Sequence, residues 1–212
     1  MRNIPLFTTE SGVASLTLDQ IAFNKTAYIR LQSSNDFEAL LYECVNFCKA
    51  VGAEKIYVSG KEIPGKCVAC GSVIRMSRPR LGIPRGAASL VSVSAERLEQ
   101  FRQLFNHGMC HVPNASCMTT KMAEQLLADQ SGYFVVLGDD LIGIGIAKGE
   151  WIHGIVSLKR GMGETIMQAL NAALQGEFVR VELIDSNYPA KSLYERMGFC
   201  LVETVSQWYE IF

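Results

Sequence analysis

Apolar and polar positions in the C-terminal part of the chain alternate between the two-residue period of strands and the 3.6-residue period of helices. Apolar residues recur with helical spacing at Ile166, Ala169, Leu170, Ala173 and Leu174, which predicts an amphipathic helix packed on a sheet. Short apolar runs bounded by turn residues predict strands on both sides of it. From about residue 90 onward the predicted order is β-α-α-β-β-β-α-β-α-β. This order indicates an α/β (α+β) fold with a mixed central sheet flanked by helices.

The N-terminal part repeats a fragment of this plan. Predicted strands at 27–31 and 56–58 enclose a predicted helix that ends at Gly52. Asn35 and Glu38 form a capping-box-like start to that helix. This βαβ unit parallels residues 151–185 in order and spacing. It is either a degenerate copy of the C-terminal part or simply a common supersecondary unit.

A break in the pattern at 77–87 suggests where two domains meet. The segment has two prolines, two glycines and three arginines without an apolar period, so it predicts a linker or a long loop. It separates a domain at 1–80 from a domain at 88–212, and both have ordinary domain sizes.

Composition excludes several classes of protein. The 212 residues are 49% hydrophobic, which rules out disorder, and their net charge of −1 argues against nucleic acid or an anionic membrane as a partner. No apolar stretch has the length of a signal peptide or a membrane span, so we expect a cytoplasmic protein. Seven scattered cysteines favour reduced thiols over a disulfide framework. Cys67 and Cys70 make at most half a zinc site, and no metal is expected.

Two glycines lie between a predicted strand and a predicted helix, in the segment Ser157-Leu-Lys-Arg-Gly-Met-Gly-Glu-Thr-Ile166. They allow a sharp turn after which the first N–H groups of the helix can bind a phosphate, and Lys159 and Arg160 add positive charge. The simpler alternative is a tight turn with a solvated basic pair. The segment matches neither the dinucleotide fingerprint nor the Walker loop.

A second segment, 187–199, follows a predicted strand. Pro189 suits the first turn of a helix, and Gly198 ends that helix. Taken alone, Tyr194 would be a residue at the edge of the core, and Asn187 would be a residue at the helix entrance.

Together the two segments resemble the GNAT superfamily of N-acetyltransferases. The family's Arg/Gln-x-x-Gly-x-Gly/Ala loop corresponds to Arg160, Gly163 and Thr165, and Thr165 departs from the usual small residue. The family's Asn-x-x-Ala-x-x-x-Tyr-x-x-x-Gly-Phe pattern is matched in full by Asn187, Ala190, Tyr194, Gly198 and Phe199. The resemblance covers about residues 90–212, and its two motifs lie in the expected order. The β-branched Thr165 narrows the approach to a pyrophosphate.

The resemblance implies an acetyl-CoA site in a V between the fourth and fifth strands. It places the pantetheine arm on Asn187 and on the backbone of Ile155, Val156 and Ser157. It places the pyrophosphate on the backbone amides of Arg160, Gly161, Met162, Gly163, Glu164 and Thr165. It assigns Tyr194 to the thiol, where a phenol can protonate the departing thiolate. In the N-terminal part, the segment 32–37 has no glycine and carries Asp36, so we expect no CoA site there.

The implied function is an acyl-CoA-dependent N-acetyltransferase that acts on a small-molecule or peptide amine by direct attack. The alternative is a non-catalytic acyl-CoA-binding or regulatory module with the same fold. The general base is not visible. His153 on the fourth strand can serve, although a sheet histidine without a role is the simpler interpretation. His107, His111 and Asn114 are candidate acceptor-site residues, and the acceptor and the oligomeric state stay open.

Overall fold

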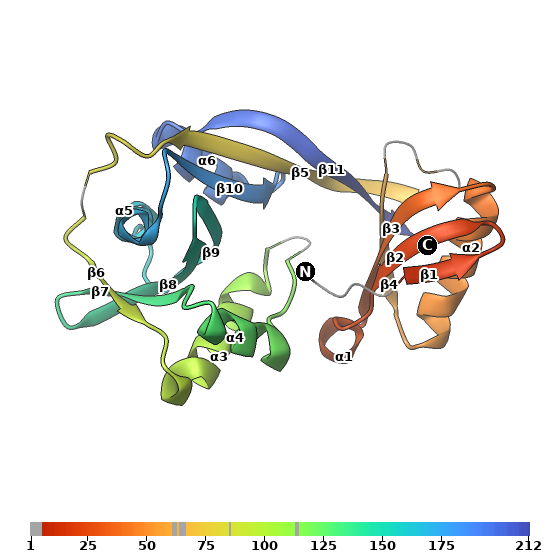
Figure 1. The fold of residues 1–212 in the computed structure, drawn as a ribbon, viewed down its shortest axis with the longest axis horizontal. Helices are drawn as coiled ribbons and strands as arrows, with labels where there is room; N and C mark the ends of the chain where they lie inside the picture. The colour runs from red at the N-terminus through yellow and green to blue at the C-terminus, as the bar shows by residue number, and fades with distance from the viewer. Residues whose placement is uncertain (1–5, 61–62, 64–66, 85, 113–114) are drawn as a thin grey trace. The chain divides into compact units, whose positions relative to one another are not determined.

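The computed structural model of the protein describes residues 6–60, 63, 67–84, 86–112 and 115–212 (Figure 1). The chain forms two compact units, one of Met1–Val73 with Thr204–Phe212 and one of Ile74–Glu203. Two long strands, β5 (Cys67–Pro79) and β11 (Cys200–Ile211), contribute residues to both units. This division differs from the predicted bounds, 1–80 and 88–212, because the last residues of the chain pair with a strand of the N-terminal unit. The domain bounds themselves stay a prediction.

The N-terminal unit is a sheet with one long helix. Its strands follow the order β1-β2-β3-β4-β11-β5. Its other elements are β1 Leu6–Thr9, β2 Gly12–Thr17, α1 Ile21–Asn24, β3 Thr26–Ser34, α2 Phe37–Ala50 and β4 Lys55–Ser59. Strands β3 and β4 are parallel, which requires a crossover connection, and α2 provides it. The helix buries Leu40, Cys44 and Cys48 in a core that also contains Ile29 and Val58.

Helix α2 begins one residue later than the predicted cap. The N-cap is Asp36, and its side chain accepts a hydrogen bond from the N–H of Ala39 at 3.0 Å. The capping-box-like pattern predicts this start at Asn35 instead. Both residue types are good caps, and only the backbone at residue 36, which is extended at φ −137° and ψ 105°, selects the aspartate.

The C-terminal unit is a mixed sheet with helices on both faces, in the strand order β6-β7-β8-β9-β10-β5-β11. Its other elements are β6 Ser89–Ser92, η1 Ala95–Arg97, α3 Leu98–Met109, α4 Thr120–Ala128, β7 Gly132–Leu137, β8 Asp140–Lys148, β9 Trp151–Ser157, α5 Gly163–Leu170, η2 Asn171–Ala173, β10 Phe178–Ile184 and α6 Tyr188–Arg196. This order and the fold class agree with the prediction. Figure 1 shows α5 on one side of β7–β9 and α3 with α4 on the other.

Two separate cores hold these helices on the sheet. Phe101, Met118 and Leu126 of the α3–α4 side pack with Phe134 and Ile144 of the sheet. On the other side, the core is formed by α5, α6 and the sheet residues that face them, including Ile152, Ile166, Leu170, Val181 and Tyr194.

Three glycines let two helices lie unusually close to the sheet. A Cβ on Gly145 of β8 would be 2.4 Å from the Leu170 side chain of α5, and one on Gly143 would be 2.3 Å from Ile166. A Cβ on Gly108 of α3 would be 2.2 Å from Val156 of β9. These close contacts set how near α5 and α3 lie to the sheet, and Gly108 brings α3 against Val156 of β9.

Each unit inserts a strand from a distant part of the chain beside its last parallel strand. In the N-terminal unit, β11 lies next to β4, with Trp208 opposite Ser59 and Ile211 opposite Ile56. In the C-terminal unit, β5 lies next to β10. The sequence pattern places the whole last strand in the C-terminal domain and predicts no strand at 67–79, so both strand positions correct the prediction.

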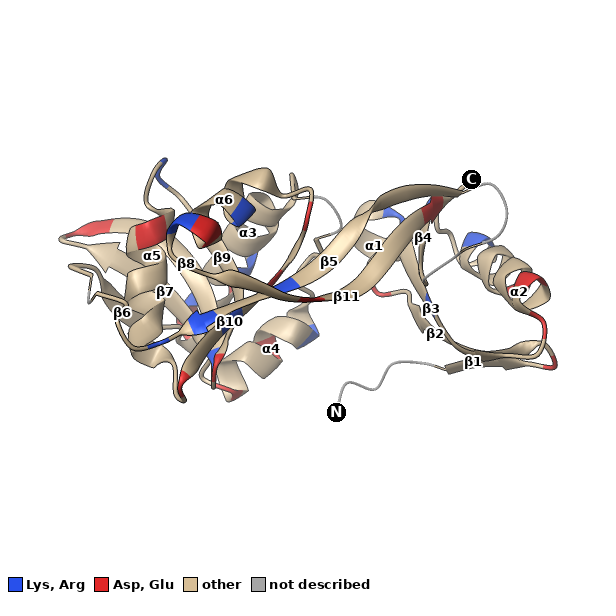
Figure 2. Cartoon of the chain, turned by 90° about the horizontal axis from the view of Figure 1, so that it is seen from above, with Lys and Arg blue, Asp and Glu red and all other residues tan. Residues whose placement is uncertain are grey.

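Charged residues of both signs are interspersed in both units (Figure 2), as the net charge of −1 suggests. Within the described ranges, no helix is long and apolar enough to cross a membrane. In the same part of the chain, no group of three or more His, Cys, Asp or Glu side chains is placed to hold a metal ion.

Candidate active site

The parallel strands β9 and β10 separate soon after they begin. Only two residue pairs join them, Arg180 with Trp151 and Val181 with Ile152, although β9 continues to Ser157 and β10 to Ile184. The facing backbone edges of the two strands beyond these pairs are therefore not closed by mutual hydrogen bonds. This opening lies where the family resemblance places the V for acetyl-CoA.

A β-bulge in β9 accompanies this separation. Ile146 of β8 lies opposite Gly154, but the next residue, Ala147, lies opposite Ile152, so His153 is the extra residue. Bulges bend a strand and redirect its side chains, and they are frequent next to active sites. Ile155 and Val156 then direct their side chains into the cores on opposite faces of the sheet, which leaves their backbone as the part that can meet a ligand in the opening.

The equivalent strands of the N-terminal unit do not separate. Strand β4 is paired with β3 along its whole length, from Lys55 opposite Thr26 to Ser59 opposite Arg30. The helix between them is capped by the carboxylate of Asp36. The described residues of this unit therefore show neither an opening between the parallel strands nor a free helix N-terminus.

Helix α5 is the next element after β9, which ends at Ser157, and it has no side-chain cap. Gly161 has φ 83°, the left-handed region that favours glycine, and a Cβ placed there would meet no atom within 4 Å. Met162 is the N-cap residue, and it makes no side-chain cap hydrogen bond. The N–H groups of Gly163, Glu164 and Thr165 in the first turn have no partner within the helix, and they lie at the positive end of its dipole.

The charges around this turn differ from the expectation in one respect. Lys159 forms an ion pair with Asp140, with Nζ 2.7 Å from Oδ2, so its charge is already matched. Arg160 is exposed and in no ion pair with another described residue. Glu164 is also exposed, and its Oε1 accepts a hydrogen bond from Nε2 of Gln168 at 3.2 Å. The net positive charge that can meet a phosphate is thus that of Arg160, with Glu164 opposing it.

Asn187 is the N-cap of α6. Its Oδ1 accepts a hydrogen bond from the N–H of Ala190 at 3.4 Å, which confirms the helix-entrance role considered from sequence. The cap engages only the oxygen, so the Nδ2 amide is the group that can donate to a pantetheine arm. That contact stays a prediction.

Tyr194 is buried in the C-terminal core, where its ring packs against Phe199 with centroids 5.5 Å apart. Burial raises the pKa of Tyr194 to about 12, because the phenolate is poorly solvated there. The described residues offer no hydrogen-bond partner to its hydroxyl. A phenol with this pKa is protonated at neutral pH, so it can act as a proton donor and not as a base.

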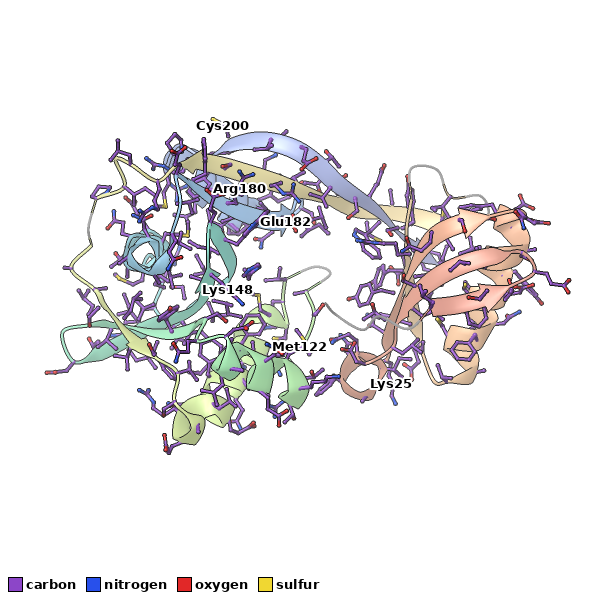
Figure 3. The ribbon with its side chains drawn as sticks, in the orientation of Figure 1. Lys25, Met122, Lys148, Arg180, Glu182 and Cys200 are labelled. Carbon is purple, nitrogen blue, oxygen red and sulfur yellow. The ribbon has the colours of Figure 1, made fainter. Side chains whose placement is uncertain are left out.

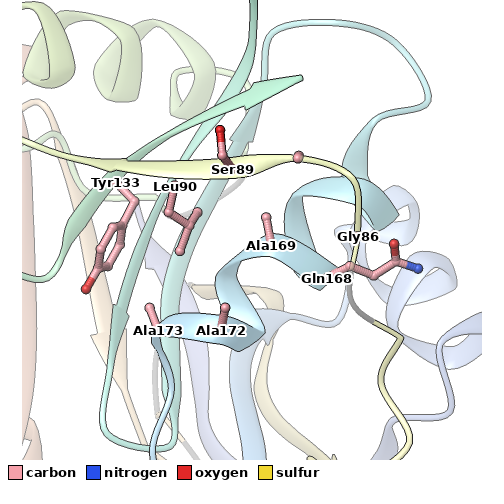
Figure 4. Close-up of a pocket in the computed structure, with 9 residues that line it drawn as sticks. Gly86, Ser89, Leu90, Tyr133, Gln168, Ala169, Ala172 and Ala173 are labelled. Atoms are coloured by element: carbon pink, nitrogen blue, oxygen red, sulfur yellow. The ribbon is translucent and has the colours of Figure 1, made fainter. Parts of the chain in front are cut away.

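The candidate acceptor-site residues lie at and after the end of α3. His107 is exposed near the end of α3, and His111 is exposed in the segment after it. Asn114 lies outside the described residues. A separate hollow of about 360 Å³ lies between β6 and α5 and shares no residue with the predicted site (Figure 4). Its lining includes Leu90, Tyr133, Gln168 and Ala173.

Some residues that shape the site carried no signal used in the sequence analysis. Gly143 and Gly145 set the height of α5 above the sheet, and Gly108 does the same for α3. Their spacing in apolar segments, Gly-x-Gly on a predicted strand, is the one pattern that could have indicated a close helix. Gly163 also has a packing role, because a Cβ there would be 2.8 Å from Leu193 of α6.

The chain is similar to known proteins in its structure. No protein-family model matches the sequence, and no curated protein matches it. A GCN5-related N-acetyltransferase from Sphaerobacter thermophilus is similar over 95% of this chain and 76% of its own, with a TM-score of 0.61 at 12% identity. A GNAT-family acetyltransferase from Colwellia psychrerythraea is similar over 98% of this chain and 84% of its own, with a TM-score of 0.54 at 12% identity.

A tandem GNAT protein of clavulanic acid biosynthesis is similar over 95% of this chain and 78% of its own, with a TM-score of 0.55 at 12% identity. At this identity the matches define the fold. The chain has the GNAT fold, in the two-part layout that the tandem protein also has.

Proposed function

We propose that the protein is an acyl-CoA-dependent N-acetyltransferase whose C-terminal unit binds acetyl-CoA between β9 and β10. The observation that carries the proposal is the separation of these strands after Val181 and Ile152, followed along the chain by the uncapped start of α5, whose first three N–H groups have no partner within the helix. A strand edge without partners suits an amide-bearing pantetheine arm, and the start of α5 suits a pyrophosphate.

In the proposed reaction, the nitrogen of an acceptor amine attacks the thioester carbonyl carbon. The N–C bond forms, the C–S bond breaks, and the sulfur leaves with the electron pair. A backbone N–H at the bulge of β9 stabilises the oxyanion, and the Tyr194 hydroxyl gives its proton to the thiolate. No protein nucleophile is needed, so none of the seven cysteines has a part in the reaction.

The N-terminal unit is proposed to bind no CoA. Its parallel strands are paired along all of β4, and the carboxylate of Asp36 occupies the helix start that would otherwise face a phosphate. One molecule of CoA per chain is therefore the expected stoichiometry.

Titration calorimetry with CoA and acetyl-CoA tests this proposal. We expect one site per chain and a rise in thermal stability of RT ln(1 + [L]/Kd), about 2.7 kcal/mol at a hundredfold excess over Kd. Gly161→Val is the informative variant, because residue 161 is on the surface of the loop and its left-handed backbone resists a β-branched side chain. It should weaken CoA binding while the rest of the unit stays folded.

Gly163→Val is less clean as a probe, because it also displaces Leu193. Absence of any binding at millimolar CoA would refute the proposal, and two sites per chain would refute the assignment to the C-terminal unit. Binding without turnover of acetyl-CoA would favour the alternative, a non-catalytic acyl-CoA-binding module.

A further inference from the structure

A row of stacked side chains from strands β5 and β9 ends at the bulge in β9. The guanidinium of Arg75 on β5 lies over the ring of Trp151 on β9, with its carbon 5.0 Å from the ring centroid. The rings of Trp151 and His153 are stacked, with centroids 6.2 Å apart and planes inclined by 15°. Residues two apart on a strand share a face, and this stack holds the imidazole plane in one orientation.

Two carboxylates hold Arg75, which is at the other end of this row of side chains. Oε1 of Glu182 accepts hydrogen bonds from Nε and Nη2 of Arg75 at 3.0 and 2.7 Å, and Nη1 of Arg75 pairs with Glu203. Glu182 lies on β10, where Figure 3 labels it, and Glu203 lies on β11. Because these strands flank β5 in the sheet, the guanidinium is held from both sides and cannot turn freely.

His153 stands at the point where the proposed reaction takes place. It is the extra residue of the bulge, and it immediately follows the last residue of β9 that pairs with β10. Its side chain is exposed. On the next residue, Gly154, a Cβ would be 3.0 Å from Phe105 of α3, so this helix covers β9 just past the histidine.

We propose that His153 is the general base of this site, with Trp151 and Arg75 as positioning residues; the inference rests on the proposed acetyl transfer. A nitrogen of the neutral imidazole takes the proton of the attacking amine as the N–C bond forms. The imidazolium later returns this proton to water, and Tyr194 regains its own, so the protein is unchanged after each turnover.

The surroundings favour the cation that forms in this step. Trp151 presents its ring to the imidazolium, a cation–π arrangement. The positive charge of Arg75, which lies over the same ring, is matched by Glu182 and Glu203, so no unpaired cation at that end of the stack opposes the imidazolium.

Other charged groups near the histidine are matched in pairs or exposed. Lys148, opposite Trp151 on β8, forms an ion pair with Asp129 at 3.0 Å. At the start of the strand pair, Arg180 and Glu150 are joined at 2.9 Å. On the covering helix α3, the nearby titratable side chain is the exposed His107.

The test uses the full chain and water as the acceptor, so no amine need be known. CoA released from acetyl-CoA is measured by chromatography between pH 6 and 9 for the wild type, His153→Gln and His153→Ala. We expect a fall of at least tenfold in both variants and the loss of a rate increase near neutral pH, where imidazoles release their proton. Added imidazole should restore part of the rate to His153→Ala and should not change the wild type.

Trp151→Leu separates positioning from catalysis. The rate of CoA release by this variant should fall several-fold while its pH dependence stays the same, because the His153 imidazole is present but no longer kept in one orientation by the Trp151 ring. Lys121→Gln, an exposed change on α4, is the control and should match the wild type. CoA affinity is measured for every variant by calorimetry, and it should stay within twofold of the wild-type value.

The outcomes separate the two proposals. If His153→Gln binds CoA and releases it at the wild-type rate at every pH, His153 is not the base and the acetyltransferase proposal stands. If imidazole fails to rescue His153→Ala, the assignment is overturned as well. If the wild type does not bind CoA, the proposed enzyme function itself is refuted, and if it binds acetyl-CoA without releasing any CoA, the non-catalytic acyl-CoA-binding alternative is favoured over both proposals.

Discussion

The Tyr194→Phe variant gives the sharpest separation between a packing role and a chemical role. The substitution keeps the ring and its 5.5 Å contact with Phe199, and it removes only the hydroxyl. The hydroxyl is not one of the fully buried polar atoms that lack a partner among the described residues, so its removal leaves no unpaired buried group behind. The free energy of unfolding should therefore stay the same or rise by up to ~1 kcal/mol.

Turnover should respond in the opposite direction. A positioned proton donor contributes about 10²–10⁴ in rate, which corresponds to a barrier increase of about 3–5 kcal/mol when it is lost. The pKa of about 12 does not disqualify the phenol as a donor. Burial also raises the pKa of a thiol, so a CoA thiolate held in a dry site is likewise a stronger base.

The assay pairs the initial rate of CoA release from acetyl-CoA with urea unfolding of the same samples. A wild-type rate in Tyr194→Phe would show that the tyrosine is a packing residue. In that case only Tyr194→Ala would harm the protein, through a cavity that costs ~3–5 kcal/mol. CoA affinity should barely change in the phenylalanine variant, and a large loss would contradict the reasoning.

Three further predictions follow from the contacts described above. Arg160→Gln should weaken CoA binding and Glu164→Gln should strengthen it, each by about threefold in Kd at low salt. The effects should be smaller in 0.5 M salt, because exposed charges contribute ~1 kcal/mol or less and are screened. If calorimetry shows that both variants change the Kd in the same direction, this reasoning is wrong. Gly145→Val should lower stability by ~1–3 kcal/mol, because the new Cβ meets Leu170 at 2.4 Å, and an unchanged melting temperature would exclude that close contact. Burial raises the pKa of the Cys44 thiol from 9.0 to about 12, so the folded state keeps a proton that the unfolded chain releases. The stability that this retained proton contributes is intact below about pH 9 and is lost as the pH rises toward 12. The urea midpoint of Cys44→Ala should therefore fall less between pH 8 and 10.5 than the urea midpoint of the wild type. An equal fall in the two proteins would refute the linkage.

The sequence by itself determined the order of elements in the C-terminal unit. The helical spacing of apolar residues around Leu170 is a property of that segment alone, so it predicts the helix without knowledge of what the helix packs against. The two GNAT-like segments were also readable, because glycines and a helix-starting proline act through the backbone of their own neighbours. The cap of α2 was misplaced by one residue, since Asn35 and Asp36 are both good caps and only the local backbone chooses between them.

The sequence alone did not predict which strands pair with each other. Residues 67–79 have no clear alternation of apolar and polar positions, and they form a strand because they are bordered by strands of both units. The last strand, Cys200–Ile211, pairs with β4 over Trp208–Ile211, some 150 residues away along the chain. A strand's own residues favour an extended backbone, but the neighbouring strand is selected by packing and hydrogen bonding in the folded sheet.

The same reason explains what remained hidden at the site. The motif supplied Arg160, Asn187 and Tyr194, each from its own segment. Which parallel pair opens is a question of register between segments: β9 and β10 separate at His153, whereas β3 and β4 stay paired along all of β4. The bulge, the stack of His153 on Trp151 and the anchor at Arg75 arise only when strands distant in sequence lie side by side, and tertiary packing alone decides that.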